Sequence, residues 1–164
     1  MQFTHKHTFA ASVTDVVTML ADSDFAKLRA EAAGDGKGSV IVDGSAETAF
    51  TVSIRRIVPA TSIPAEFRSF VGSDLHVRYT EAWQAPDRDD RVGTFAVEIV
   101  GAPGHVSGAV GLTPSDAGTE FLATGEVKVS VPLFGGMIER AVVSAVEKGL
   151  ADELASADTW LASR

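Results

Sequence analysis

Residues 131–164 read VPLFGGMIERAVVSAVEKGLADELASADTWLASR, and this stretch decides the fold. Apolar side chains recur along it every three or four residues, which is the spacing of an amphipathic helix. The apolar stripe consists of Met137, Ile138, Ala141, Val142, Ala145, Leu150, Leu154 and Leu161. A helix of about 28 residues spans about 42 Å, the length of a strand of about a dozen residues. The spacing therefore predicts a C-terminal helix that can cover the whole face of a sheet.

The region of residues 39–131 changes to a period of two, which is typical of strands with one buried face. Turn signals rich in glycine, proline and aspartate divide it into about six strands. The apolar positions that share a parity are Phe50, Val52 and Ile54; Leu75, Val77, Tyr79 and Trp83; Phe95, Val97 and Ile99; and Phe121, Ala123, Val127 and Val129. The intervening positions are mostly polar. The pattern predicts an antiparallel sheet with one apolar and one solvated face.

The first 38 residues predict a strand followed by two short helices. Phe3–Phe9 alternates as a strand does, and Ser12 is a suitable N-cap for a first helix. A second helix is expected to begin at Asp22 or Ser23 and to end at the glycine-rich run of residues 34–38. Its predicted apolar stripe is Phe25, Leu28 and Ala32. These elements complete an α+β domain in which the first strand can pair with the last, and we expect residues 1–164 to form one domain.

Composition limits the classes of function. The chain of 164 residues has no cysteine, which excludes disulfides and thiolate chemistry. Its formal net charge of −8 argues against a nucleic-acid partner, because such proteins usually neutralise phosphates with Lys and Arg. No apolar run reaches the roughly 20 residues that span a bilayer, and the N-terminus lacks the layout of a signal peptide. We therefore expect a cytoplasmic protein without integral membrane association and without a cofactor.

Three stretches carry a family resemblance. They are Thr80-Glu81-Ala82-Trp83, Gly101-Ala102-Pro103-Gly104, and Val131 to Glu139 with the closing Trp160-Leu161. In these residues and in its order of elements the chain resembles the START/Bet v 1-like (SRPBCC) superfamily, which includes polyketide cyclases. Within it, the chain resembles an uncharacterised actinobacterial family of the DUF2505 type. The resemblance implies a helix-grip fold of about seven strands and a cavity that takes lipid-, sterol- or polyketide-like ligands.

The expected cavity lies between the apolar sheet face and the C-terminal helix. Its predicted lining is Phe50, Val52, Ile54, Leu75, Val77, Tyr79, Glu81, Phe95, Val97, Phe121, Met137, Ile138 and Ala141. Small residues such as Ala123, Gly125, Gly135 and Gly136 favour a hollow, since they remove volume. The same residues also suit close contact between helix and sheet, so the sequence leaves a hollow and a packed interior both open.

Glu81 is the polar residue that stands out on the apolar face. An unpaired carboxylate is costly to bury, so Glu81 faces a ligand, pairs with an arginine such as Arg56, or is solvated near the strand end. In a ligand-facing role, desolvation would raise its pKa and suit a general acid or base. Arg56 follows Arg55 where the alternation breaks, which predicts a β-bulge. We favour a surface position for both arginines; the alternative is that one points inward, to bind a ligand carboxylate or to pair with Glu81. Tyr79 either offers its hydroxyl to the cavity or fills the core.

His5 and His7 share a strand face, but nothing in the sequence supplies further ligands, so no metal site is expected. The favoured function is non-catalytic binding of a hydrophobic small molecule, by a carrier or sensor. The alternative is a cyclase or dehydratase that uses Glu81, and a second alternative is a protein-interaction module. An interaction module would require a large exposed apolar patch, which the polar outer strand positions do not favour.

Overall fold

The computed structural model describes residues 1–32, 37–62, 65, 68–71 and 74–164. Its elements are β1 (Gln2–Phe9), α1 (Val13–Leu20), α2 (Ser23–Ala32), β2 (Ser39–Gly44), β3 (Phe50–Pro59), the 3₁₀ helix η1 (Ala60–Ser62), α3 (Arg68–Val71), β4 (Asp74–Trp83), β5 (Arg91–Ile99), β6 (Gly104–Ser115), β7 (Gly118–Val129) and α4 (Gly135–Ala162). The predicted order is confirmed, with η1 and α3 as additions. The predicted glycine-rich connection at 34–36 and turn at 72–73 lie outside the described residues.

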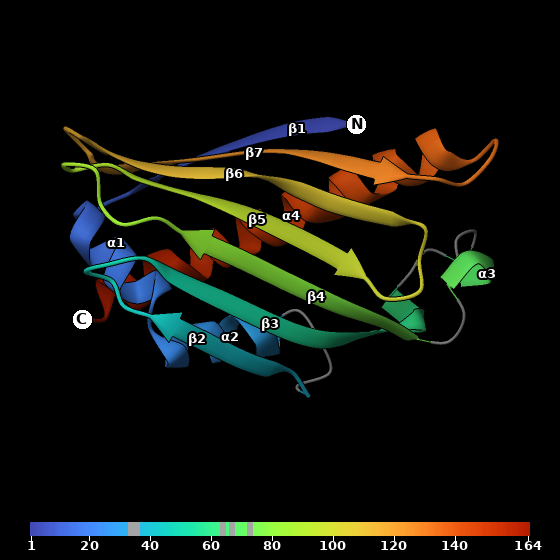
Figure 1. The fold of residues 1–164 in the computed structure, drawn as a ribbon, viewed down its shortest axis with the longest axis horizontal. Helices are drawn as coiled ribbons and strands as arrows, with labels where there is room; N and C mark the ends of the chain where they lie inside the picture. Colours follow the sequence, from blue (N-terminus) through green and yellow to red (C-terminus); the bar gives the residue numbers. More distant parts are fainter. Residues whose placement is uncertain (33–36, 63–64, 66–67, 72–73) are drawn as a thin grey trace.

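The seven strands form one antiparallel sheet in the order β1-β7-β6-β5-β4-β3-β2 (Figure 1). The first strand pairs with the last, as predicted, and Phe9 lies opposite Thr119 in that pair. Every other neighbouring pair in the sheet follows directly in sequence. The strands β1 and β2 are therefore the two edges of a curved sheet.

The register places the predicted apolar positions on one face. Ile54 lies opposite Tyr79, Tyr79 opposite Val97, Val97 opposite Val106, and Val106 opposite Val127. Since side chains directly opposite each other project to the same side, this row runs across the concave face of five strands. The predicted division into an apolar and a polar face is confirmed.

The predicted bulge near Arg56 is wrong. The pairing of β3 with β4 continues without interruption from Phe50 opposite Trp83 to Pro59 opposite Asp74. The unbroken alternation turns Arg56 to the concave face and leaves Ile57 on the convex face. The sequence departs from the apolar pattern here because the concave face itself carries an arginine.

The two short helices differ in how well their buried faces were predicted. Ser12 caps α1 as expected, and its hydroxyl accepts a hydrogen bond from the backbone N–H of Asp15. The predicted stripe of α2 is wrong beyond its first member, because Leu28 is 37% exposed and Ala32 is also exposed. The face of α2 that packs on the sheet consists of Phe25, Ala26, Arg29 and Ala30.

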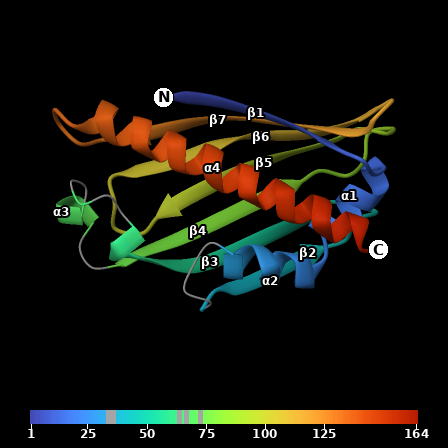
Figure 2. The same ribbon diagram turned by 180° about the vertical axis from the view of Figure 1, so that it is seen from behind.

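Helix α4 is the predicted long C-terminal helix, with 28 residues. Figure 2 shows it crossing the concave side of the sheet diagonally, from the β7 side at its start to α1 and α2 at its end. In its first half, Val142, Val143 and Val146 pack against a small core of Phe3, Val106 and Val127. In its second half, Leu154, Ala157 and Trp160 join the main core. None of the described helices is long and apolar enough to span a membrane.

Two glycines face each other in the middle of the sheet, and aromatic rings occupy the space that they leave. A Cβ atom on Gly108 would lie 2.7 Å from Cζ of Phe95, and one on Gly125 would lie 2.6 Å from the ring of Phe3. At Gly125, the small residue therefore serves close packing. Any hollow under α4 has to be sought elsewhere on the concave face.

Candidate functional site

The concave face of the sheet is tightly closed at the end covered by α1, α2 and the second half of α4. Phe50, Val52 and Ile54 are 1%, 0% and 2% exposed there, and Phe121 is 7% exposed. All four residues belong to the main core cluster. The structure thus places these four predicted lining residues inside a packed core.

The opposite end of the concave face is not closed in this way. The side chains of Leu75, Tyr79, Val97 and Ile99 point to the concave side but are only half-buried. Val77 is buried, yet it belongs to neither of the two core clusters. We call this group the open end of the sheet. Its apolar side chains lack the tight cover that the same face receives at the other end.

The first half of α4 shows the same incomplete burial. Ile138 and Ala141 are half-buried and join neither core cluster, and Met137 is 45% exposed. No residue of α4 before Leu154 is fully buried. Of the predicted lining residues of β4 and β5, Tyr79 packs against the main core, Val97 against the small core and Phe95 against both. The predicted lining residues that join neither core are Leu75, Val77, Met137, Ile138 and Ala141.

Gly149 of α4 lies three residues after Val146 and four before Glu153, and both of these side chains reach inward. Residues at these spacings share one helix face, so a side chain at position 149 would point to the same side. Gly149 itself is exposed, and a Cβ atom built there meets nothing within 4 Å. The edge of this helix face is therefore open to solvent at position 149.

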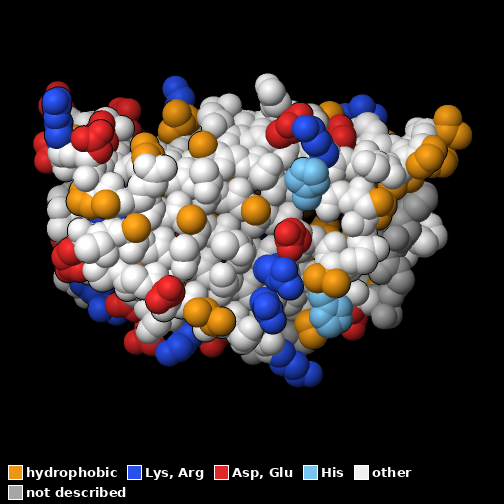
Figure 3. Space-filling view, viewed as in Figure 1, with side chains coloured by type: hydrophobic (Ala, Val, Ile, Leu, Met, Phe, Trp, Pro, Cys, Tyr) orange, Lys and Arg blue, Asp and Glu red, His pale blue; other side chains and the backbone are white. Residues whose placement is uncertain are grey.

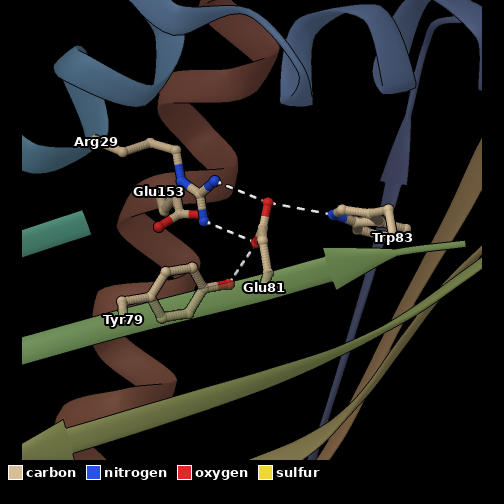
Figure 4. A network of polar contacts seen from close by, with 5 residues as sticks. All are labelled: Arg29, Tyr79, Glu81, Trp83 and Glu153. Carbon is tan, nitrogen blue, oxygen red and sulfur yellow. Dashed lines mark hydrogen bonds and ion pairs between the residues drawn. The ribbon is translucent and has the colours of Figure 1, made fainter. Parts of the chain in front are cut away.

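A network of buried polar groups connects the sheet with α2 and α4, with Glu81 at its centre (Figure 4). Oε1 of Glu81 accepts hydrogen bonds from Nη1 of Arg29 at 3.0 Å and from the Trp83 indole at 3.2 Å. Oε2 accepts from Nη2 of Arg29 at 3.1 Å and from the Tyr79 hydroxyl at 2.5 Å. Each carboxylate oxygen therefore has two donors, and the pairing with Arg29 is bidentate.

Arg29 joins three layers of the structure. It projects from α2, binds Glu81 of β4, and places Nη2 3.0 Å from Oε1 of Glu153 on α4. The guanidinium also lies 5.1 Å from the centre of the Tyr79 ring. The side chains of Arg29 and Glu81 are 2% and 4% exposed, whereas that of Glu153 is 30% exposed. The network thus extends from the closed interior toward the more open side of α4.

The electrostatics of the network keep Glu81 ionised. Burial acts to raise the pKa of Glu81, but the charge of Arg29 and the hydrogen bonds from Arg29, Tyr79 and Trp83 bring it below its ordinary value of 4.5. Burial and the neighbouring Glu81 charge raise the pKa of Tyr79 well above 10.0. The expectation of a raised pKa for Glu81 is therefore wrong. Its pairing with an arginine is confirmed, with Arg29 in place of Arg56.

Arg56 lies on the concave face of β3, opposite Val77 of β4. It is half-buried, and its Nε atom is buried without a hydrogen-bond partner. Burial lowers its pKa, while the charge of Glu153 acts in the opposite direction. The predicted surface position is therefore wrong for Arg56 and correct for Arg55, which is exposed.

The histidines do not join this network. His5 and His7 share the concave face of β1, as predicted, and Nε2 of His7 lies 3.0 Å from Oδ2 of Asp158, at an angle that makes no hydrogen bond. The described part of the chain contains no group of three or more His, Asp or Glu side chains arranged to hold a metal ion.

A separate surface hollow of about 850 Å³ lies at the closed end, where the start of α1 meets the β6–β7 turn and Arg88. No residue of α4 and none of the predicted lining residues borders it. It is therefore distinct from the space between the sheet and α4.

Two residues of this site, Arg29 and Glu153, were not singled out in the sequence. One available signal was the spacing of Arg29, four residues after Phe25 and between Ala26 and Ala30. A charged residue that shares a helix face with apolar neighbours predicts a buried partner of opposite charge.

Comparison with known proteins gives a family and a fold. The profile of a family described as "Protein of unknown function (DUF2505)" matches residues 4–161. No curated protein matches the sequence. Among solved structures, the protein TTHA0849 from Thermus thermophilus is similar with a TM-score of 0.66 and 13% identity, over 99% of this chain and 98% of that chain.

Two further structures are similar in fold. Ara h 8.0201 matches with a TM-score of 0.60 and 13% identity, over 100% of this chain and 99% of that one. A norcoclaurine synthase point mutant from Thalictrum flavum matches with a TM-score of 0.56 and 15% identity, over 99% of this chain and 94% of that one. At these identities the likeness concerns the fold, which is the helix-grip fold of the START/Bet v 1-like superfamily.

Proposed function

The chain belongs to the DUF2505 family, and we propose that it binds a hydrophobic small molecule between the open end of its sheet and the first half of α4. In this proposal the protein is a carrier or sensor and leaves its ligand chemically unchanged. The ligand class is lipid-, sterol- or polyketide-like, as in the superfamily whose fold the chain shares.

The observation that carries the proposal is the difference between the two ends of one apolar face. Ile54 is 2% exposed in the core, whereas Tyr79 and Val97, in the same row across the sheet, are half-buried. Apolar surface left without cover costs about 25 cal/mol per Å², so a ligand that covers it gains that free energy. Leu75 and Ile138 are likewise half-buried, and they join neither core cluster.

The enzyme alternative, a cyclase or dehydratase with Glu81 as acid or base, has less support. Tyr79 and Glu81 do converge, but both oxygens of Glu81 already accept two hydrogen bonds each, and its lowered pKa leaves it ionised and weakly basic. A general base needs a free acceptor within reach of the substrate proton. Glu81 better serves to hold α2, β4 and α4 in place.

The interaction-module alternative would need a contiguous apolar patch outside the cavity. On the convex face seen in Figure 3, hydrophobic side chains over the strands are scattered among polar atoms. They gather at the end of the molecule where β7 joins α4, and Leu133 there is 98% exposed. Phe134 and Met137, close to Leu133 in the chain, are 44% and 45% exposed. This cluster is confined to one end, and the scattered apolar residues over the strands are ordinary on a protein surface, so the sheet face gives the alternative little support.

Fluorescence titration with methyl cis-parinarate, an uncharged polyene ester, tests the binding proposal. The wild type should bind one equivalent in an apolar environment. Ala141→Phe, which enlarges a half-buried side chain in the first half of α4, should weaken binding at least tenfold. Ala151→Phe introduces the same side chain at an exposed position of α4 and should bind as the wild type does. Binding that is absent from the wild type, or unaffected by Ala141→Phe, would refute the proposal.

A further inference from the structure

Arg56 is a cation at an otherwise apolar place. It lies opposite Val77 on the concave face, in the row that continues to Ile99 of β5. Within the part of the chain that the structure describes, its guanidinium makes no hydrogen bond and no ion pair, and Nε is closed off from solvent. A buried guanidinium donor without a partner is costly, so this position is incomplete as it stands.

The carboxylates nearby are already engaged by the other arginine. Both oxygens of Glu81 bind Arg29, and Oε1 of Glu153 lies 3.0 Å from Nη2 of Arg29. Glu153 acts on Arg56 through its charge alone, and the charge of Arg29 opposes it. Arg29 thus binds both acidic groups, whereas the guanidinium of Arg56 has N–H donors without an acceptor among the described residues.

We propose that the ligand of this protein is an apolar molecule with a carboxylate group, and that Arg56 binds that carboxylate. The inference rests on the proposed function and names the chemical class of its ligand. The planar fork of a guanidinium matches a carboxylate with two parallel hydrogen bonds. The apolar part of the same molecule would lie along Val77, Val97 and Ile138.

The neighbouring residue provides a matched control. Arg55 carries the same charge, lies on the opposite face of β3 and is exposed. Arg56→Gln and Arg55→Gln therefore change the net charge of the protein equally, and only the first removes a cation from the concave face. Arg56→Lys keeps the charge and loses the fork, so it should retain part of the binding.

The experiment compares cis-parinaric acid with its methyl ester, titrated into the wild type and the three variants at pH 7. The wild type should bind the acid more tightly than the ester. Arg56→Gln should weaken binding of the acid on the order of ten- to a hundredfold, which is the effect of losing a hydrogen bond to a charged group. Ester binding should stay the same in all three variants, and Arg55→Gln should bind the acid as the wild type does.

Two results would overturn the inference and leave the proposed function standing. One is a wild type that binds the ester as tightly as the acid, which needs no variant to observe. The other is an Arg56→Gln variant that loses acid and ester equally, or that loses neither. A wild type that binds neither probe would instead overturn the proposed function, and this inference with it.

Discussion

At the scale of single residues, Glu81 and Arg29 form an ion pair in the interior of the protein. Their side chains are only 4% and 2% exposed. Removing one partner of such a pair leaves the other as an uncompensated buried charge. The protein should therefore be sensitive to the loss of either charge alone. Such a loss of stability measures the uncompensated charge and not the net contribution of the pair.

We predict that Arg29→Met and Glu81→Gln each lower the free energy of unfolding by about 3 kcal/mol or more. The double variant should lose clearly less than the sum of the two, because neither charge is then left alone. Urea denaturation measures all three values. Glu98→Gln, which breaks the exposed pair of Arg78 and Glu98, is the control and should cost less than about 1 kcal/mol. Additive losses in the double variant would mean that the two groups do not act as a pair.

Tyr79 gives a second prediction, because it is the only tyrosine of the chain. Its pKa in the folded protein is raised well above 10.0, by burial first and by the Glu81 charge next. A raised pKa means that the phenol contributes stability below pH 10 that is lost as the pH rises through the folded value. The phenolate absorbance should therefore appear only together with alkaline unfolding. Phenolate formation near pH 10 in a still folded protein would contradict the buried hydrogen bond to Glu81.

The face on which a residue lies could be predicted from the sequence, but its partner in the fold could not. The parity of Glu81 correctly placed it on the apolar face, since strand alternation depends only on local backbone geometry. Its partner could not be found in this way, because Arg29 lies 52 residues earlier, on a different element. Arg56 was misplaced because the surface position was favoured over the inward one, on the strength of a bulge that the unbroken pairing of β3 with β4 does not contain.

At the scale of elements, the sequence predicted nearly all that depends on periodicity. The first strand, the six that follow and the long helix were found because each has a repeating buried face. The short elements η1 and α3, with three and four residues, carry no complete period and were not predicted. The buried face of α2 was assigned wrongly because Leu28 was given more weight than two alanines and an arginine.

The two kinds of glycine give a prediction about elements. Gly149→Ala should raise the free energy of unfolding by about 0.5–1 kcal/mol, because alanine favours the helix and the added Cβ meets nothing within 4 Å. Gly125→Ala should lower it, because its Cβ would lie 2.6 Å from the ring of Phe3. Thermal unfolding of both variants measures the difference in sign. A destabilising Gly149→Ala would contradict the open surroundings of this helix position.

At the scale of the whole molecule, the two ends of the sheet differ in how they are covered. The end under α1, α2 and the last turns of α4 provides the main core, with Phe9, Phe25, Phe50 and Leu112 each at most 1% exposed. The other end has half-buried apolar side chains and Arg56, whose Nε atom has no hydrogen-bond partner among the described residues. The sequence could not separate the two ends, because an apolar residue that packs and one that lines a hollow are of the same type.

The central claim is that the apolar part of a ligand lies between the open end of the sheet and the first half of α4. A crystal structure of the protein in complex with dodecanoic acid tests this most directly. We predict density for the alkyl chain in contact with Val77, Val97 and Ile138. An alkyl chain bound on another face, or side chains of β4, β5 and α4 that meet and fill the space, would contradict the account.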